Sequence, residues 1–270
     1  MITKARIKRH LRGLGIRPGA VLLVHSSLTS IGWVEGGADA VVAALLAAVG
    51  PRGALMVPSF SFLNFEPVFD PRTTPSEVGA ITEAARRHQG ARRSLHPRHS
   101  VVVIGANAEK LTSGHLAAGA LGRGSPPDKL AREGGRVLLL GVRHEANSII
   151  HVAEAYAEVP YLGAPRSPGF PEEAAVRVPG GEVVTVGLLP IPTCSRGFGK
   201  LEPLLRAKGL IRYGRVGRAR CQLMRAQAVI DVAVEILRRN PRFLLCDVPG
   251  CWACARKREM IAAAKTARQG

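Results

Sequence analysis

The sequence predicts an α/β fold with a layered, largely parallel or mixed central sheet flanked by helices and a smaller C-terminal α+β portion. Short apolar runs with the length of buried strands alternate with longer segments of helical composition. Glycine and proline stand at the junctions between them. The 270 residues, of which 46% are hydrophobic, suffice for a substantial core.

The first part of the chain predicts the order helix, strand, helix, strand. A basic helix at residues 2–15 ends at two glycines, and a Pro-Gly turn then leads into a short apolar strand at residues 20–24. Residues 38–49 have helical composition and stop at a Gly-Pro pair, and residues 54–57 form the next strand. Because such a succession forms a right-handed crossover, we expect the two strands to be parallel.

The middle of the chain continues the alternation. Residues 58–75 contain four prolines, which predict a long irregular loop. A helix at residues 78–88 follows a serine cap, and the apolar run at residues 100–104 forms a strand. The same criteria give a helix at residues 108–116, a strand at 137–141 and a helix at 148–159.

The pattern changes after Gly163. Residues 176–186 form a hairpin whose turn is Pro179-Gly180-Gly181. Helical composition recurs at residues 198–207 and 226–239, and a short apolar run at residues 243–246 predicts a strand. The chain contains no repeat, low-complexity segment or linker-like shift in composition. We therefore expect a single domain over residues 1–270, in which the portion from about residue 164 completes the fold.

The charge balance is strongly basic, with 38 Lys and Arg against 20 Asp and Glu and a formal net charge of +18. Such a field attracts anions, either nucleic acid or a small polyanion such as a nucleotide cofactor. Aromatic residues, at 4%, are too sparse for a base-stacking platform, so a nucleic-acid partner is disfavoured. No apolar run approaches the roughly 20 residues that span a membrane, and no apolar segment follows the basic start. We expect a cytoplasmic protein, and the sequence does not distinguish a monomer from a homodimer.

The segment with the clearest chemical content follows the strand at residues 137–141. His151 and Glu154 stand three residues apart in a helical segment, so both side chains leave one face. Ligands bind at the carboxyl ends of strands in open α/β sheets. A histidine held by a carboxylate is suited to general base catalysis near neutral pH. The alternative is a buried structural histidine beside a solvated charge.

Two other segments are suited to anionic ligands. The turn His25-Ser26-Ser27 follows a buried strand, where backbone N–H groups and hydroxyls bind phosphate oxygens, but taken alone the two serines fit plain helix capping better. The segment from Arg93 to Ser100 combines two histidines, two arginines and two serines, and arginine presents several donors to a phosphate. Gly122–Pro127 lacks the preceding strand of a dinucleotide motif and is interpreted as a rigid turn.

Three of the five cysteines form a compact cluster near the C-terminus, namely Cys246, Cys251 and Cys254. The two-residue spacing between Cys251 and Cys254 is common at structural zinc sites, and either Cys194 or Cys221 supplies a fourth thiolate in that interpretation. The alternative is that the thiols of a cytosolic protein are simply buried and free.

Together these motifs resemble the aminoglycoside 3-N-acetyltransferase family, the acetyl-CoA-dependent antibiotic N-acetyltransferases that lack the GNAT fold. The motifs occur in the family's order over about residues 20–235. They are Leu22-Leu-Val-His-Ser-Ser-Leu28 with Gly32 and Gly36-Gly37, Val57-Pro-Ser-Phe60, Phe69-Asp-Pro71, Pro75-Ser-Glu-Val-Gly79, Arg93-Ser-x-His96-Pro-x-x-Ser100, Gly124-Ser-Pro126, Leu138-Leu-Leu-Gly141, Asn147-Ser-x-x-His151-x-Ala-Glu154 and, more weakly, Gly214-x-Val-Gly217-x-Ala219.

The resemblance implies acetyl-CoA as donor, an amine as acceptor and direct transfer without an acyl-enzyme. It makes His151 the candidate general base and Glu154 its neighbour in the active site. The residues it places toward coenzyme A are His25, Ser26, Ser27, Arg93, Ser94, His96 and Ser100. Those it places toward the acceptor are Phe60, Glu145 and Asn147.

The charge departs from what the resemblance implies, because aminoglycosides are polycations and a net charge of +18 repels them. We therefore expect a neutral or anionic amine as acceptor. Three alternatives remain: a longer acyl-CoA as donor, a family member that binds coenzyme A without catalysis, and a basic nucleic-acid-binding protein with a zinc-holding C-terminal tail.

Overall fold

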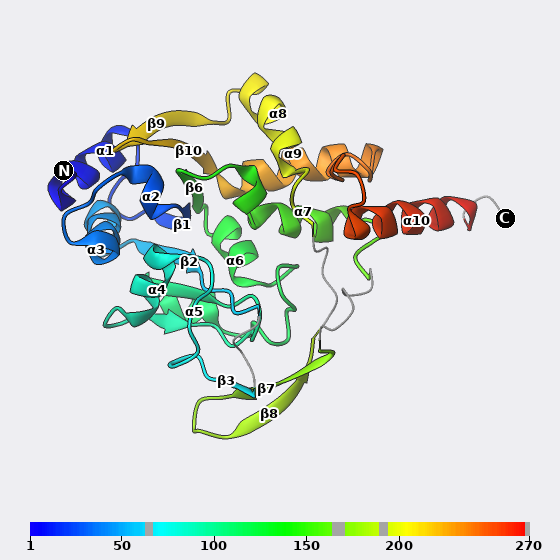
Figure 1. Ribbon diagram of the computed structural model, residues 1–270, viewed down its shortest axis with the longest axis horizontal. Coiled ribbons are helices and arrows are strands. Elements are labelled where there is room, and N and C mark those ends of the chain that lie inside the picture. The colour runs from blue at the N-terminus through cyan, green and yellow to red at the C-terminus, as the bar shows by residue number, and fades with distance from the viewer. Residues whose placement is uncertain (63–66, 164–170, 189–193, 268–270) are drawn as a thin grey trace.

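The computed structural model describes residues 1–62, 67–163, 171–188 and 194–267. Its main feature is a seven-stranded mixed sheet with the strand order β4-β5-β2-β1-β6-β10-β9 (Figure 1). In sequence order these strands are β1 (Val21–Ser26), β2 (Ala54–Pro58), β4 (Arg92–Arg93), β5 (Val101–Gly105), β6 (Arg136–Leu140), β9 (Arg212–Val216) and β10 (Ala219–Arg225). β1 is parallel to β2 and to β6, and the other neighbours are antiparallel.

Helices cover both faces of this sheet and form a separate hydrophobic core with each face. One face packs against α1 (Lys4–Gly13), α2 (Leu28–Ile31), α3 (Gly37–Val49) and α4 (Ala80–Arg87). The other packs against α5 (Ala108–Thr112), α6 (Pro126–Arg132), α7 (Ile149–Ala157), α8 (Glu202–Ala207), α9 (Ala226–Arg239) and α10 (Trp252–Thr266), with the 3-10 helix η2 (Phe198–Leu201).

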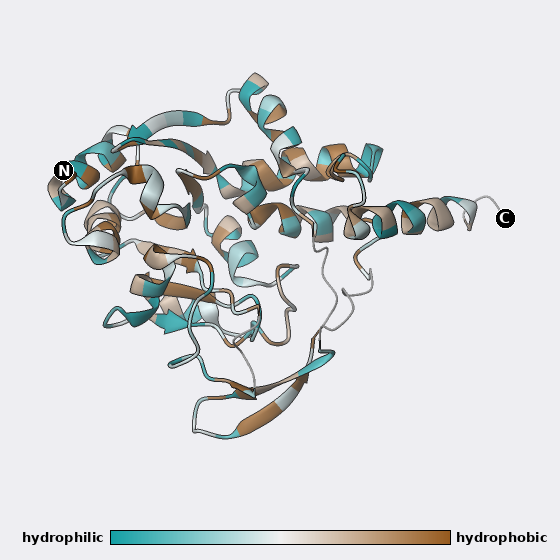
Figure 2. Cartoon of the chain, viewed as in Figure 1, coloured by the Kyte–Doolittle hydropathy of each residue, from teal (hydrophilic) through white to brown (hydrophobic). Residues whose placement is uncertain are grey.

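The inner strands are apolar throughout because both of their faces are buried. In β1, Leu22 and Val24 join the core beneath α1–α4, and Leu23 joins the opposite core. Successive strand residues point to opposite faces, so one continuous apolar run supplies two cores. Figure 2 shows hydrophobic residues concentrated on the central strands and the adjoining helices.

A second, three-stranded sheet with the order β3-β7-β8 lies at one end of the molecule (Figure 1). Its strands are β3 (Val68–Phe69), β7 (Glu173–Arg177) and β8 (Val183–Gly187). β7 and β8 form the hairpin predicted from Pro179-Gly180-Gly181. β3 belongs to the segment predicted as an irregular loop, four residues of which (63–66) lie outside the described part of the chain.

The predicted α/β class and the mixed, helix-flanked sheet are confirmed, and the predicted strands correspond to β1, β2, β5 and β6. The prediction of a strand at residues 243–246 is wrong. The backbone N–H of Phe243 bonds the carbonyl of Asn240, and that of Leu245 bonds the carbonyl of Arg242, as in consecutive turns. This apolar run is buried as a turn against the core instead of extending into a sheet.

The helices α6 and α10 and the strands β9 and β10 were not among the predicted elements. α6 begins at Pro126, inside the segment interpreted as a rigid turn, because proline is tolerated in the first turn of a helix. β10 pairs with β6, so the C-terminal portion extends the central sheet. The single domain over residues 1–270 stays a prediction. Across the described residues, no helix combines the length and the apolar character needed to cross a bilayer.

Candidate active site

A cavity of about 790 Å³ opens at the carboxyl ends of the three parallel strands. His25 and Ser26 come from the end of β1, Pro58 ends β2, and Val142 follows β6. Parallel strands bring their carboxyl ends to one edge of a sheet, which is where open α/β sheets bind ligands. The volume is that of a site for a small organic molecule.

His151 and Glu154 form a direct hydrogen-bonded pair at this cavity. Both lie on α7, and His151 Nδ1 is 2.6 Å from Glu154 Oε2. Glu154 is fully buried, and its other oxygen, Oε1, accepts a hydrogen bond of 3.1 Å from the Tyr161 hydroxyl. The carboxylate fixes the ring through Nδ1, so Nε2 is the ring nitrogen available to a ligand in the cavity. The edge of the Phe198 ring packs on the imidazole at 4.9 Å between centroids.

The His25 turn carries buried polar groups toward the same cavity. Burial lowers the pKa of His25 to about 3, with a smaller contribution from His144, so the ring is neutral at pH 7. Its Nε2 lies 3.4 Å from the Ser148 hydroxyl. Ser27 lies outside the cavity lining, and its hydroxyl accepts from the backbone N–H of Ser30, which is the capping role named as the alternative.

Arg93 lies outside the cavity lining, with its guanidinium buried among backbone and hydroxyl acceptors. Nη2 donates to the Ser59 carbonyl and the Ser61 hydroxyl, both at 2.7 Å, Nε donates to Ser100 Oγ at 2.9 Å, and Nη1 donates to the Thr74 carbonyl. Burial lowers the pKa of Arg93 to about 9. The side chain therefore fastens the segment after β2 to β4 and β5.

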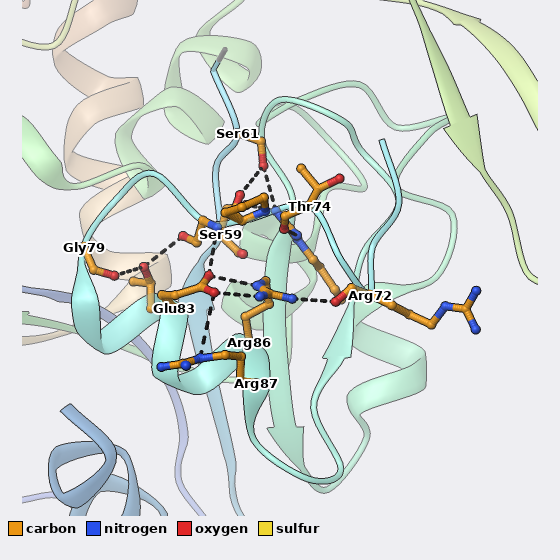
Figure 3. Close-up of polar contacts among 12 residues, drawn as sticks. Ser59, Ser61, Arg72, Thr74, Gly79, Glu83, Arg86 and Arg87 are labelled. Carbon is orange, nitrogen blue, oxygen red and sulfur yellow. Dashed lines mark hydrogen bonds and ion pairs between the residues drawn. The ribbon is translucent and has the colours of Figure 1, made fainter. Parts of the chain in front are cut away.

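The ion pair between Glu83 and Arg86 on α4 lies next to Arg93 and holds the adjoining segment in place. Figure 3 shows both oxygens of Glu83 bonded to Arg86, and Arg86 bonded in turn to the backbone carbonyl of Arg72. Glu83 also accepts from the backbone N–H of Ser76. These contacts hold the segment from Arg72 to Ser76 against α4, and Thr82 of the same helix lines the cavity.

Ser94 and His96 belong to the loop that precedes β5, and both have structural hydrogen-bond partners. Ser94 Oγ accepts from the backbone N–H of Val101 and lies 2.8 Å from His115 Nδ1. His96 Nδ1 accepts from the backbone N–H groups of Arg98 and His99. Burial, followed by the charge of His115, lowers the pKa of His96 to about 3. Both residues shape the loop that carries Arg98 and His99 to the cavity.

Some of the site residues predicted from the sequence thus lie together at the cavity. Those that line the cavity are His25, Ser26, Phe60, Glu145, Asn147 and His151. Glu154 lies directly behind His151, whereas Ser27, Arg93, Ser94, His96 and Ser100 lie outside the lining. Contact of the last five with coenzyme A stays a prediction.

Sequence reasoning missed several lining residues. Arg98 and His99 belong to the predicted loop, but its pattern did not indicate which of its side chains reach the cavity. Arg196 and Trp252 come from segments without any recognisable motif. Ser26 Oγ, His99 Nδ1 and Asn147 Oδ1 are buried and have no hydrogen-bond partner among the described residues. Three polar atoms of cavity-lining residues, from three different segments, therefore lack a partner in the described part of the chain.

The cysteine cluster contains Cys194 and excludes Cys221. The Sγ atoms of Cys194, Cys246, Cys251 and Cys254 all lie within 4.8 Å of one another. Cys221 lies on β10, and its thiol contacts the Ala219 carbonyl at 3.6 Å. Cys194 and Cys251 also line the cavity.

Comparisons with known proteins agree with this architecture. The family model described as aminoglycoside 3-N-acetyltransferase matches residues 23–238. Aminoglycoside N(3)-acetyltransferase IV from Salmonella sp is 36% identical over 244 residues, covering 90% of each chain. Aminoglycoside N(3)-acetyltransferase VII from Streptomyces paromomycinus is 32% identical over 266 residues, covering 86% of this chain and 90% of that protein.

Solved structures extend the similarity to the whole fold. A histidine-to-alanine variant of aminoglycoside acetyltransferase AAC(3)-IVa in complex with a gentamicin has a TM-score of 0.85 and 35% identity, covering 96% of this chain and 98% of that one. AAC-IIIb in its binary complex with coenzyme A has a TM-score of 0.78 and 27% identity, covering 88% and 96%. The chain therefore belongs to the aminoglycoside 3-N-acetyltransferase family, and it is an acyltransferase.

Proposed function

We propose that this protein is an acetyl-CoA-dependent N-acetyltransferase in which His151 removes the proton from the attacking amine. The observation that carries the proposal is the 2.6 Å contact between His151 Nδ1 and Glu154 at the wall of the cavity. The named relatives and the coenzyme A complex of AAC-IIIb support the reaction class and the donor.

The chain's residues divide the chemistry between them. Acetyl-CoA supplies the thioester when it is bound. His151 Nε2 takes a proton from the amine as the new N–C bond forms and the C–S bond breaks, and that proton then goes to the departing thiolate. Glu154 holds the tautomer with its proton on Nδ1 and stabilises the positive charge that develops on the ring. Because most amines are protonated at pH 7, placing an unprotonated amine beside the thioester supplies much of the rate.

The cavity lining separates candidate ligand-binding groups by charge. His25 is neutral at pH 7 because its pKa is lowered to about 3, so it is suited to hydrogen bonding and not to neutralising a phosphate. Arg98 and Arg196 are the cationic groups suited to an anionic ligand. Ser26 and Asn147 offer the unpartnered oxygens described above. These residues would hold the donor and the acceptor near His151.

The acceptor in this proposal is an amine of low positive charge. Glu145 is the single carboxylate among the described lining residues, which also include the guanidinium of Arg196. The net charge of +18 acts in the same direction at long range. Structures of AAC(3)-IVa with gentamicin and apramycin show that a relative binds polycations. Turnover of polycationic amines must therefore be compared directly with turnover of neutral and anionic amines.

One experiment tests the catalytic assignment and the acceptor class together. Release of free coenzyme A is followed with a thiol reagent for a panel of aminoglycosides and a panel of neutral and phosphate-bearing amines. We expect His151→Ala to lower kcat by about 100-fold or more while the affinity for coenzyme A, measured by calorimetry, stays unchanged. The matched control is His88→Ala, because His88 is an exposed histidine at the end of α4.

Two results would contradict the proposal. Turnover at the wild-type rate by folded His151→Ala would contradict the general-base role of His151. Faster turnover of kanamycin-type amines than of phosphate-bearing amines at physiological salt would contradict the proposed acceptor class. The nucleic-acid alternative stays a prediction. Salt-sensitive oligonucleotide binding without a thermal shift from coenzyme A would favour it.

A further inference from the structure

The four clustered cysteines come from three separate segments of the chain. Cys194 precedes η2, Cys246 lies in the turn after α9, and Cys251 and Cys254 lie at the start of α10. Three of the four are buried, and Cys251 is half-buried. Segments separated by more than 50 residues therefore present their thiols to one point.

The sulfur atoms are spaced closely enough for one ion to contact all four, because none lies more than 4.8 Å from another. Cys194 Sγ is 3.8 Å from Cys246 Sγ and 3.7 Å from Cys251 Sγ. Four sulfurs placed about 2.3 Å from a central zinc ion lie about 3.8 Å from one another. Disulfide sulfurs lie about 2.0 Å apart, so the observed spacing fits metal coordination far better.

A buried ammonium group lies beside the cluster. Lys257 is only 1% exposed, and in the part of the chain that the structure describes it forms no ion pair with a carboxylate. Its ammonium group donates to the Cys194 carbonyl at 3.4 Å and lies 5.0 Å from the centre of the Tyr161 ring. A buried cation needs a nearby negative charge. Four thiolates around a divalent ion carry a net charge of −2 and supply one.

Further donors complete the surroundings of the four thiols. The backbone N–H of Cys246 donates to Cys254 Sγ at 3.3 Å, the kind of contact that stabilises a metal-bound thiolate. Arg258 donates to the Cys246 carbonyl at 2.6 Å, and Lys200 donates to the Leu245 carbonyl at 2.8 Å. Each of these bonds fixes the turn that carries Cys246.

From these observations we infer that Cys194, Cys246, Cys251 and Cys254 bind one structural Zn²⁺ ion. A closed set of four thiolates is the chemistry of structural zinc, and it has no open position for a substrate. The ion would join the segment before η2 to the start of α10. Both segments line the active-site cavity, through Ser195 and Arg196 on one side and Trp252 on the other. The metal therefore fixes one wall of the cavity.

This inference is tested by measuring the zinc content of the 270-residue protein. The protein is purified without a polyhistidine tag and without chelators. We expect about one zinc per chain in the wild type and more than about tenfold less in Cys254→Ser. Cys221→Ser is the matched control, because Cys221 is also buried but lies outside the cluster. Cys251→His should retain the metal and Cys251→Ser should lose it, since imidazole is also a zinc ligand.

Two further measurements keep the result decisive if a variant unfolds. Cobalt substitution of the wild type should give the intense visible bands of a tetrahedral thiolate site. Alkylation of the denatured wild type without reductant should modify all five cysteines. Zinc-free protein with two or four thiols blocked as disulfides would overturn the inference, as would zinc-free protein with five free thiols.

Whether the metal fixes this wall of the cavity is tested separately by enzyme kinetics, and this test rests on the proposed function. In Cys254→Ser, whose side chain belongs to the cluster but not to the cavity lining, we expect KM for the acceptor to rise at least about tenfold with a smaller change in kcat, because the wall and not the base is displaced. An unchanged KM in zinc-free enzyme would contradict this role but leave the metal site intact. The zinc content can be measured whether or not the protein acetylates amines. Failure of the zinc proposal is therefore distinguishable from failure of the proposed function.

Discussion

Replacing Glu154 with glutamine separates the negative charge of this side chain from its hydrogen bonding. The amide has nearly the size of the carboxylate, its oxygen can accept from His151 Nδ1, and its nitrogen can pair with the Tyr161 hydroxyl. The ground-state geometry should therefore persist. What disappears is the charge that faces the imidazolium when His151 has taken the proton.

The contact geometry sets the size of the effect. Glu154 is 1% exposed, so solvent does not screen its charge, and its oxygen lies 2.6 Å from the ring nitrogen. A hydrogen bond to a charged group contributes about 1.5–3 kcal/mol, and here that contribution reaches full strength only as the ring becomes charged. Its loss corresponds to a decrease in kcat of roughly 10- to 150-fold.

The assay measures kcat and KM from thiol release with saturating acetyl-CoA. We expect Glu154→Gln to lower kcat within this range and to leave KM for the acceptor within about threefold of the wild type. Tyr161→Phe is the matched control, because it removes one hydrogen bond from the same carboxylate without changing its charge, and we expect less than about a tenfold effect. Folded Glu154→Gln with wild-type kcat would refute the reasoning.

Two further predictions concern stability. Burial lowers the pKa values of His25 and His96 from 6.5 to about 3, so the unfolded state binds more protons in this interval and stability falls as pH decreases from 6.5 toward 3. Each histidine should cost about 2 kcal/mol at pH 5, which urea titrations at pH 7 and pH 5 detect, and equal stability at both pH values would contradict this. Arg93→Lys should lower the free energy of unfolding by about 3 kcal/mol, because lysine replaces a fork that reaches four acceptors. A matched Arg92→Lys change, in an exposed side chain, should have little effect on the urea midpoint.

The parts of the fold that sequence analysis predicted are those with a local physical signal. The apolar runs of β1, β2, β5 and β6 are buried on both faces, and so they stand out in any reading of hydrophobicity. The pair His151 and Glu154 is fixed by helical spacing alone. The shared helix face could therefore be predicted from the sequence, whereas the ring nitrogen that contacts Glu154 could not.

The missed parts depend on tertiary structure. β9 (Arg212–Val216) has the sequence Arg-Tyr-Gly-Arg-Val, of which only Val216 is buried, and it becomes a strand because it pairs with β10 at the edge of the sheet. α10 has a basic sequence with a weak apolar stripe and is held by buried residues such as Cys254 and Ile261. The choice of Cys194 over Cys221 follows from the packing of segments distant in sequence, which spacing does not report.

The wall of the cavity formed by Trp252 and its neighbours lies beyond residue 238, where the match to the family model ends. His151 and Glu154, the proposed base and its carboxylate, lie within the matched part. One part of the cavity wall and the pair His151–Glu154 therefore belong to different stretches of this polypeptide. Exchanging residues 247–267 between relatives would therefore alter one wall of the cavity and leave His151 and Glu154 on α7 in place.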